Sequence, residues 1–130
     1  MVDASGAVRV LVVDDEPLIR WSLTETLSEA GYEVREAGDG ESAVRAVTER
    51  EIPPDVVVLD YRLPDSNDLR LLATIRQLAP RAQVIMMTAF GTPEMTARAL
   101  ELGVYRVVSK PFEVHDLAAM VGQAHASRHV

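Results

Sequence analysis

The chain has no cysteine, so disulfide bonds, thiol nucleophiles and cysteine-ligated zinc or iron–sulfur sites are excluded. No apolar run approaches the roughly 20 residues that cross a membrane as a helix, and the first eight residues lack the apolar stretch of a secretory signal. Basic residues are also scarce, with 13 Lys and Arg against 20 Asp and Glu and a net charge of −7. This acidity disfavours binding to a phosphate backbone and is compatible with binding cations or a basic protein surface. We therefore expect a cytoplasmic domain that binds neither DNA nor a membrane directly.

The composition is that of an ordinary globular protein. Hydrophobic residues make up 48% and charged residues 25% of 130 residues, which is enough for one domain with its own core. No internal repeat or low-complexity tract divides the chain. We expect the domain to span residues 8–126, with an N-terminal extension at 1–7 and a tail or the start of a linker at 127–130.

Five short apolar runs recur along the chain. Three of them are rich in β-branched residues and show no polar alternation, which is typical of strands buried on both faces of a parallel sheet. The runs are Val10–Val13, Tyr32–Ala37, Val56–Leu59, Val84–Met87 and Val104–Val108.

Segments with helical spacing separate these runs. The first predicted helix covers Pro17–Ala30, Asp39 caps the second, one residue of Ser66–Asp68 caps the third, Thr92 caps the fourth, and the fifth contains Leu117. Strand and helix thus alternate five times. This order predicts an α/β fold of five parallel strands with helices on both faces of the sheet, because parallel strands need right-handed crossovers.

Residues able to do chemistry come directly after four of the five runs. Asp14 and Asp15 follow the first run, Asp60 follows the third, Thr88 the fourth and Lys110 the fifth. Ligands of open α/β sheets bind at the carboxyl ends of the strands, so these side chains should meet at one rim. Each has an ordinary explanation on its own, as a first-turn acid, a loop cap or a solvated lysine. Their coincidence at four strand ends favours a site.

The chemistry of this rim follows from its three carboxylates, which repel one another unless a cation lies between them. Mg²⁺ prefers oxygen ligands, and we expect Asp15 and Asp60 to contact it directly and Asp14 to act through a water. A carboxylate beside such a cation is suited to accept a phosphoryl group as an acyl phosphate. Lys110 and Thr88 would then contact the phosphoryl oxygens.

Four segments, in this order, resemble the receiver domain of two-component response regulators. They are VVDDE (Val12–Glu16), VVVLDYRLP (Val56–Pro64), MTA (Met87–Ala89) and SKPF (Ser109–Phe112). The resemblance covers about residues 8–124. It implies a flavodoxin-like (βα)5 doubly wound parallel sheet with strand order 2-1-3-4-5.

The resemblance also implies a role for each residue of the rim and for one residue beyond it. These are the phosphoacceptor Asp60, the acidic pair Asp14 and Asp15, the backbone carbonyl of Arg62 as a further ligand of Mg²⁺ (or Mn²⁺), the switch hydroxyl of Thr88, and Lys110. It further implies a cis bond before Pro111 and a sensor histidine kinase or phosphotransfer protein as partner. The resemblance implies a signalling role, with at most self-phosphorylation and slow autodephosphorylation instead of enzymatic turnover.

A finer resemblance involves LIRWSL (Leu18–Leu23), MTAFGTPEMTARAL (Met87–Leu100) and the stretch GVYRVVSKPF. These segments are similar to receivers of the NtrC class, which precede an ATPase that works with an alternative sigma factor (sigma-54) and a DNA-binding helix-turn-helix. The resemblance implies transcription regulation through a C-terminal effector absent here. It also implies a homodimer through the fourth helix, fifth strand and fifth helix on phosphorylation. Candidate residues for that face are Arg98, Val104, Tyr105 and Arg106.

Two positions depart from the family pattern. The family commonly has an aromatic residue three positions before the lysine, where this chain has Val107, and strand alternation places Tyr105 on the same face. A glycine often found eight residues after the phosphoacceptor is Asp68 here, so we expect Asp68 to cap the third helix. Asp65 is expected to be a solvated loop acid, and Trp21 a half-buried packing residue.

Other functions remain open at this point. A Mg²⁺-dependent phosphohydrolase of the haloacid dehalogenase type places a second acid two residues after its nucleophilic aspartate, where this chain has Arg62. A flavin-binding protein of the same topology needs hydroxyl- and glycine-rich phosphate contacts, where this chain has Asp14–Glu16. A stand-alone phosphorelay receiver has the same motifs as the receiver of a transcription factor, so the sequence separates these two only weakly.

Overall fold

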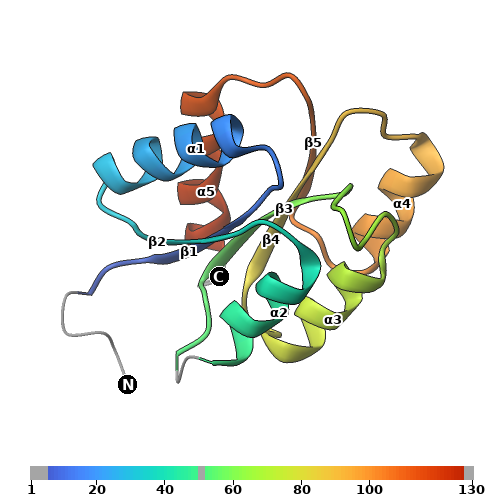
Figure 1. Cartoon of the computed structure of the whole chain (residues 1–130), viewed down its shortest axis with the longest axis horizontal. Helices are drawn as coiled ribbons and strands as arrows, with labels where there is room; N and C mark the ends of the chain where they lie inside the picture. The colour runs from blue at the N-terminus through green and yellow to red at the C-terminus, as the bar shows by residue number, and fades with distance from the viewer. Residues whose placement is uncertain (1–5, 50–51, 128–130) are drawn as a thin grey trace.

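The computed structural model of the chain describes residues 6–49 and 52–127, in which five strands alternate with five helices (Figure 1). Residues 1–5 and 128–130, which hold most of the predicted extension and tail, lie outside the described residues. The strands are β1 (Arg9–Val13), β2 (Glu33–Ala37), β3 (Val56–Asp60), β4 (Gln83–Thr88) and β5 (Arg106–Ser109). The helices are α1 (Pro17–Glu29), α2 (Gly40–Thr48), α3 (Arg70–Leu78), α4 (Pro93–Glu101) and α5 (Val114–Ser127).

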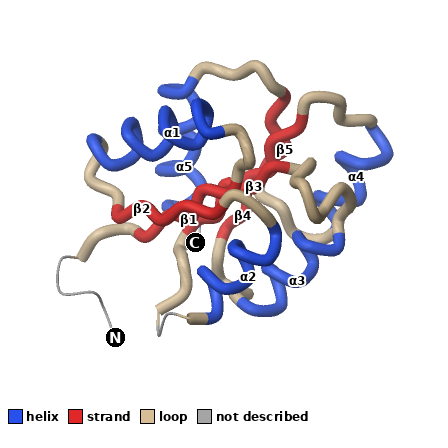
Figure 2. The backbone as a smooth tube through the Cα atoms, viewed as in Figure 1, coloured by secondary structure: helices blue, strands red, loops and turns tan. Residues whose placement is uncertain are grey.

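The five strands form one parallel sheet in the order β2-β1-β3-β4-β5, seen as the central layer in Figure 2. This order confirms the one that the resemblance implies. Every residue of β3 is buried, as the unbroken apolar run predicts. The register pairs Asp60 with Met87 and Thr88 with Ser109, so the carboxyl ends of β3, β4 and β5 meet at one edge.

Helices cover both faces of the sheet, with α1 and α5 on one side and α2, α3 and α4 on the other (Figure 1). On the first side, Leu23 and Leu27 of α1 pack with Val121 of α5 against alternate residues of the inner strands. On the second side, Leu72 and Ile75 of α3 lie at the centre of the core, fully buried. The helical spacing of apolar residues therefore predicts which stripe of each helix faces the sheet.

The predicted helix caps are confirmed for α2 and α4, where Asp39 accepts a hydrogen bond from the Ser42 amide and Thr92 from the Met95 amide. The prediction for α3 is wrong. Its N-cap is Leu69, which makes no side-chain cap, and Asp68 instead accepts from the Arg70 amide at 2.9 Å. The local turn places Asp68 one residue too early to serve as the N-cap.

Replacing Thr92 with alanine should lower the free energy of unfolding by about 1 kcal/mol, because the amide of Met95 loses its acceptor at the start of α4. Urea unfolding of the two proteins measures this difference. Thr92→Ser keeps the hydroxyl and serves as the control. Equal stability of Thr92→Ala and the parent chain would show that this bond contributes nothing.

The fifth strand starts later than predicted, at Arg106. Tyr105 precedes it in a bend and packs with Phe112 and Val108 on the α1/α5 side, whereas Val107 packs on the side of α4. The prediction that Tyr105 and Val107 share a face is therefore wrong, because the strand alternation does not extend back to Tyr105. Trp21 is also more exposed than predicted, at 62%.

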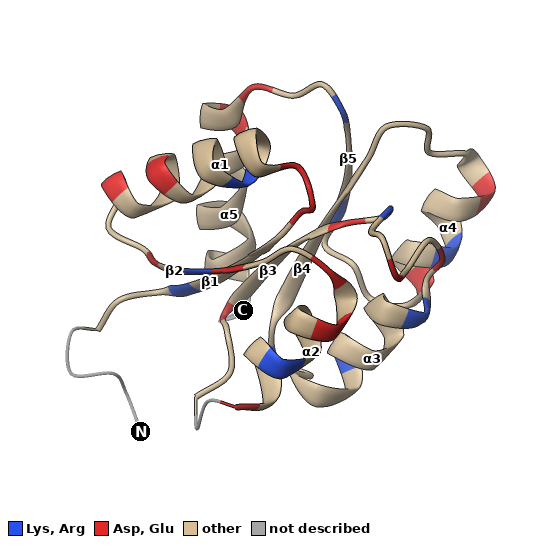
Figure 3. Cartoon of the chain, viewed as in Figure 1, with Lys and Arg blue, Asp and Glu red and all other residues tan. Residues whose placement is uncertain are grey.

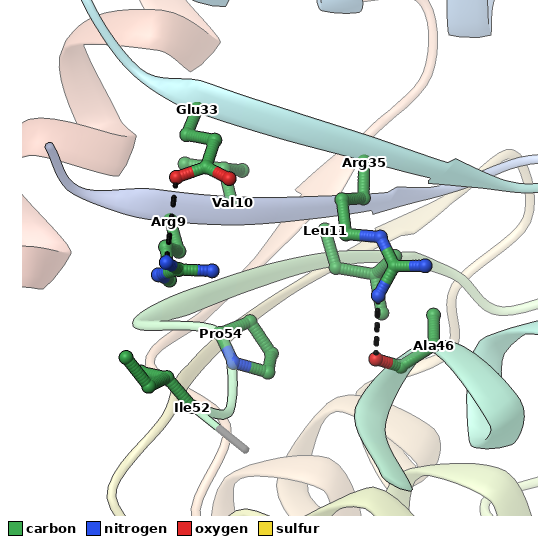
Figure 4. Close-up of a pocket in the computed structure, with 8 residues that line it drawn as sticks. All are labelled: Arg9, Val10, Leu11, Glu33, Arg35, Ala46, Ile52 and Pro54. Atoms are coloured by element: carbon green, nitrogen blue, oxygen red, sulfur yellow. Dashed lines mark hydrogen bonds and ion pairs between the residues drawn. The ribbon is translucent and has the colours of Figure 1, made fainter. Parts of the chain in front are cut away.

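The amino ends of β1 and β2 form the edge opposite to the carboxyl ends and enclose a small cavity of about 20 Å³ (Figure 4). Arg9 and Glu33 form an ion pair there at 3.6 Å, and Arg35 donates to the carbonyl of Ala46 at 3.2 Å. The volume is that of about one water molecule.

In the part of the chain that the structure describes, none of the helices has the length and apolar character needed to cross a membrane.

Candidate functional site

Three polar or charged residues are buried among those that the structure describes, namely Asp14, Asp60 and Thr88. Asp14 directly follows β1, and Asp60 and Thr88 are the last residues of β3 and β4. Figure 3 shows acidic segments after β1 and at the end of β3. Because burying an unpaired carboxylate is unfavourable, two such groups at one edge need a cation beside them.

Lys110 supplies a positive charge to this edge from the loop after β5. Its Nζ lies 3.1 Å from Asp14 Oδ2, 3.0 Å from Asp60 Oδ2 and 3.1 Å from Glu16 Oε1. The Lys110 amide also donates to the carbonyl of Thr88 at 2.8 Å, which fixes the start of the loop against β4. The peptide bond between Lys110 and Pro111 is cis, as the resemblance implies. The lysine thus joins the ends of three strands.

A divalent cation fits the oxygen donors of the acidic cluster. Asp14, Asp15 and Asp60 each offer one carboxylate oxygen, and these oxygens lie within 4.8 Å of one another. Asp15 is exposed, whereas Asp14 is fully buried with one oxygen bonded to the Glu16 amide and the other to Lys110. Carboxylates are the hard ligands that Mg²⁺ prefers. The burial of Asp14 is compatible with an indirect role, and the exposure of Asp15 leaves it accessible to a cation.

A pocket of about 320 Å³ opens over Asp60. Of the predicted site residues, Asp14, Tyr105 and Val107 do not line it. Ala89 leaves one wall without a large side chain. The lining residues are Asp15, Glu16, Asp60, Tyr61, Arg62, Thr88, Ala89, Phe90 and Lys110.

Burial raises the pKa of Asp60 from 3.8 to about 6; the hydrogen bond from Lys110 opposes the shift and the charge of Asp14 adds to it. For Lys110, burial alone would lower the pKa, but the hydrogen bonds to Asp60 and Glu16 and the charges of Asp60 and Asp14 raise it above its usual value. Lys110 is therefore a permanent cation. Asp60 is a carboxylate at neutral pH and protonates in mild acid.

The parent chain should therefore lose free energy of unfolding, relative to Asp60→Asn, as pH rises from about 4 to about 6 in the presence of a chelator. The pKa of Asp60 is about 6 in the folded state against an ordinary value of 3.8, so the folded state binds the proton more tightly in this window. That contribution is fully present below pH 3.8 and is lost as pH rises through 6. Urea unfolding of both proteins across this range measures it. Parallel pH profiles would contradict the raised pKa.

Three further residues shape the site and were missed as site residues from the sequence. Glu16 bonds Lys110, and its place beside the acidic pair was a visible signal. Arg20, one turn into α1, donates to the carbonyl of Asp14 at 2.7 Å and to Glu36 at 3.1 Å. Asp65 is exposed, as the sequence predicts, but its carboxylate also bonds the start of α2. Its partners lie about 25 residues earlier in the chain, so no local pattern reveals them.

Comparisons with known proteins agree with this geometry. Residues 10–122 match the model of the response regulator receiver domain. NtrC of Bradyrhizobium sp. (strain RP501 Parasponia) is 39% identical over 90% of this chain and 24% of its own length. CheY of Thermotoga maritima is 35% identical over 81% of this chain and 87% of its own length. The crystal structure of a CheY-like receiver domain protein from Methanospirillum hungatei JF-1 superimposes with a TM-score of 0.86 at 26% identity, covering 95% of this chain and 97% of that one.

The sheet order, the buried aspartates and the lysine at one rim define a doubly wound α/β signalling domain. With the match over residues 10–122, the chain belongs to the receiver domains of response regulators, and it is similar to those of the NtrC class. It spans about a quarter of the length of the NtrC relative, at 24%. It spans most of the CheY relative, at 87%.

Proposed function

We propose that this receiver accepts a phosphoryl group on Asp60 from a histidine kinase or phosphotransfer protein and then switches the state of an effector. The observation that carries the proposal is the contact of Asp60 with Lys110 at 3.0 Å at the floor of an open pocket, next to Asp14 and Asp15. This arrangement supplies a nucleophilic carboxylate, a fixed cation and a metal-binding pair in one place.

Each residue of the site would have a separate task in this transfer. A carboxylate oxygen of Asp60 attacks phosphorus, the bond to the donor nitrogen breaks, and the product is an acyl phosphate. Asp15, Asp60 and the Arg62 carbonyl would hold Mg²⁺, with Asp14 acting through a water, and the bound cation would neutralise charge on the phosphoryl oxygens. Lys110 holds a phosphoryl oxygen as a second cation, and the Thr88 hydroxyl donates to another.

The new charge on Asp60 would shift the domain between two conformations through Thr88. The Thr88 hydroxyl now accepts from the Phe90 amide at 3.3 Å, and a bond to the phosphoryl group would compete with that contact. A Cβ added to Gly91 would lie 2.8 Å from the Thr88 methyl carbon, so the loop before α4 passes close to this side chain. Val107 has no aromatic ring, so it cannot act as the aromatic switch that the family commonly has at this position. The signal would instead reach α4 through the loop before it.

The partner that presents the phosphoryl group would cover apolar side chains at the mouth of the site. Leu18 and Phe90 are 80% and 83% exposed. They border an open groove of about 660 Å³ that also includes Ile19, Pro111 and Phe112. Exposed apolar side chains beside a reactive group are typical of a protein contact. A sensor histidine kinase or phosphotransfer protein is the partner that fits a phosphoaspartate site in a cytoplasmic receiver.

The effector we propose is a C-terminal domain that activates transcription with sigma-54, in line with the similarity to NtrC. A stand-alone phosphorelay receiver is the second candidate, favoured by the coverage of 87% of CheY. The phosphorylated domain would dimerise through α4, β5 and α5, where Arg98 and Arg106 are exposed. Arg62 occupies the place of the second acid of a phosphohydrolase, so the site acts as a switch and not as a turnover enzyme.

Incubation with acetyl phosphate and Mg²⁺ tests the proposal, followed by intact mass and light scattering. We expect the mass of one phosphoryl group to be added and the dimer fraction to rise. Addition of EDTA in a parallel sample should prevent both. A chain that keeps its original mass with donor and Mg²⁺ present would contradict the proposed function. Phosphorylation without a change in light scattering would contradict only the dimer.

A further inference from the structure

The loop between β3 and α3, residues 61–69, is attached to the start of α2 by the side chain of Asp65. Asp65 Oδ1 accepts from the Gly40 amide at 2.7 Å, and Oδ2 accepts from the Glu41 amide at 3.1 Å. The first amides of a helix have no partner within the helix. Here Asp39 bonds the next two, through its side chain to Ser42 and its carbonyl to the Ala43 amide. Half of the amide bonds at this end of α2 therefore come from the loop that follows Asp60.

The glycine at the start of α2 allows this contact. A Cβ on Gly40 would lie 3.1 Å from Asp65 Oδ1 and 3.3 Å from the Leu71 side chain, which is tighter than ordinary contact. Gly40 does not have a positive φ, so its backbone does not require glycine. The close approach of Asp65 favours it, because a Cβ there would push the carboxylate away by a few tenths of an ångström. The hydrogen bonds of the Asp65 carboxylate and the lack of a side chain at Gly40 are two separate observations of one close contact.

The same loop carries the part of the site that follows Asp60. At one end, the Tyr61 amide donates to the carbonyl of Met87 at 2.8 Å. In the middle, Leu63 is buried, and its amide and carbonyl bond the carbonyl and amide of Ser66 at 2.7 and 3.2 Å. Arg62 lies between these two anchors, and its amide donates to Asp60 Oδ1 at 3.2 Å. Asp65 sits inside the Leu63–Ser66 turn and ties it to α2.

We propose that Asp65 is a positioning residue for the cation site. By bonding the start of α2, it holds the Leu63–Ser66 turn in place and so fixes Arg62 beside Asp60. The proposal rests on the proposed function in taking the Arg62 carbonyl as a metal ligand. Residues that orient metal ligands without touching the metal commonly change its affinity by about 10–100-fold when mutated.

Calorimetric titration with Mg²⁺ in the absence of any phosphodonor tests this role. Asp65→Ala should bind Mg²⁺ about tenfold more weakly than the parent chain. Asp65→Asn keeps an oxygen acceptor for the Gly40 amide and should bind close to the parent level. Asp68→Ala removes a carboxylate from the same loop without touching α2 and is the matched control for charge. It should leave the affinity nearly unchanged.

Gly40→Ala separates positioning from simple helix stability. Alanine favours a helix over glycine, so propensity alone would leave the protein equally or more stable. Its Cβ displaces Asp65, so the proposal expects weaker Mg²⁺ binding. Hydrogen exchange should show faster exchange of the Glu41 amide in both Asp65→Ala and Gly40→Ala.

Equal Mg²⁺ affinity of Asp65→Ala and Asp68→Ala would overturn the proposal. So would an Asp65→Asn protein that binds as weakly as Asp65→Ala, because charge alone would then explain the loss. A parent chain that binds no Mg²⁺ would overturn it together with the cation site. A parent chain that binds Mg²⁺ but takes up no phosphoryl group would contradict the proposed function and leave the role of Asp65 intact.

Discussion

Asp60→Asn should take up no phosphoryl group from acetyl phosphate under conditions in which the parent chain is phosphorylated. An amide oxygen is a far weaker nucleophile than a carboxylate, and it cannot form a stable acyl phosphate. The change keeps the size of the side chain, so the pocket and the fold should remain. Intact mass after timed incubation measures the uptake, and we expect a loss to background.

Asp68→Asn is the matched control for this variant, because it removes one exposed carboxylate from the same loop. It should be phosphorylated at the parent rate. If Asp60→Asn still gained a phosphoryl group, another residue would be the acceptor. The assignment of Asp60 from its burial and its contact with Lys110 would then be wrong.

Lys110→Met should lower the free energy of unfolding in EDTA by about 3 kcal/mol at neutral pH, the cost of removing one partner from a buried ion pair. The ammonium group lies within 3.1 Å of both Asp14 and Asp60, which are 0% and 5% exposed. Without it, two buried carboxylates face each other. Urea unfolding measures the loss.

Saturating Mg²⁺ should restore part of this stability, because a divalent cation replaces the missing charge. Binding to the folded state alone contributes about 2.7 kcal/mol when Mg²⁺ exceeds its dissociation constant about 100-fold. Arg81→Met removes an exposed cation and should change stability by less than about 0.5 kcal/mol. A Lys110→Met protein as stable as Arg81→Met in EDTA would show that Lys110 does not hold the carboxylates together.

The sequence predicts which residues come together at the rim because these residues follow apolar runs. Asp60 and Thr88 end strands that are neighbours in the sheet, so their separation in sequence, 28 positions, is removed by the parallel topology. Lys110 joins them through the next strand. Two rules are enough for this inference. Strands that alternate with helices form a parallel sheet, and ligands bind at the carboxyl ends of its strands.

The errors arise where one residue of register or a distant contact decides the outcome. Strand alternation predicts that Tyr105 shares a face with Val107, but β5 begins at Arg106 and the tyrosine packs on the opposite side of the sheet. Asp65 has the composition of a solvated turn acid, yet its partners are amides of Gly40 and Glu41. A contact between a loop and the start of another helix leaves no periodic signal.

The acceptor can be identified directly by reducing the phosphorylated chain with borohydride, which converts an acyl phosphate of aspartate into homoserine. Peptide mass spectrometry then locates the modified position. We predict homoserine at residue 60 in the peptide that contains VVVLDYRLP, and none when Mg²⁺ is removed with EDTA before the donor is added. Homoserine at Asp15, or a phosphoryl group on Thr88 that resists reduction, would contradict the account.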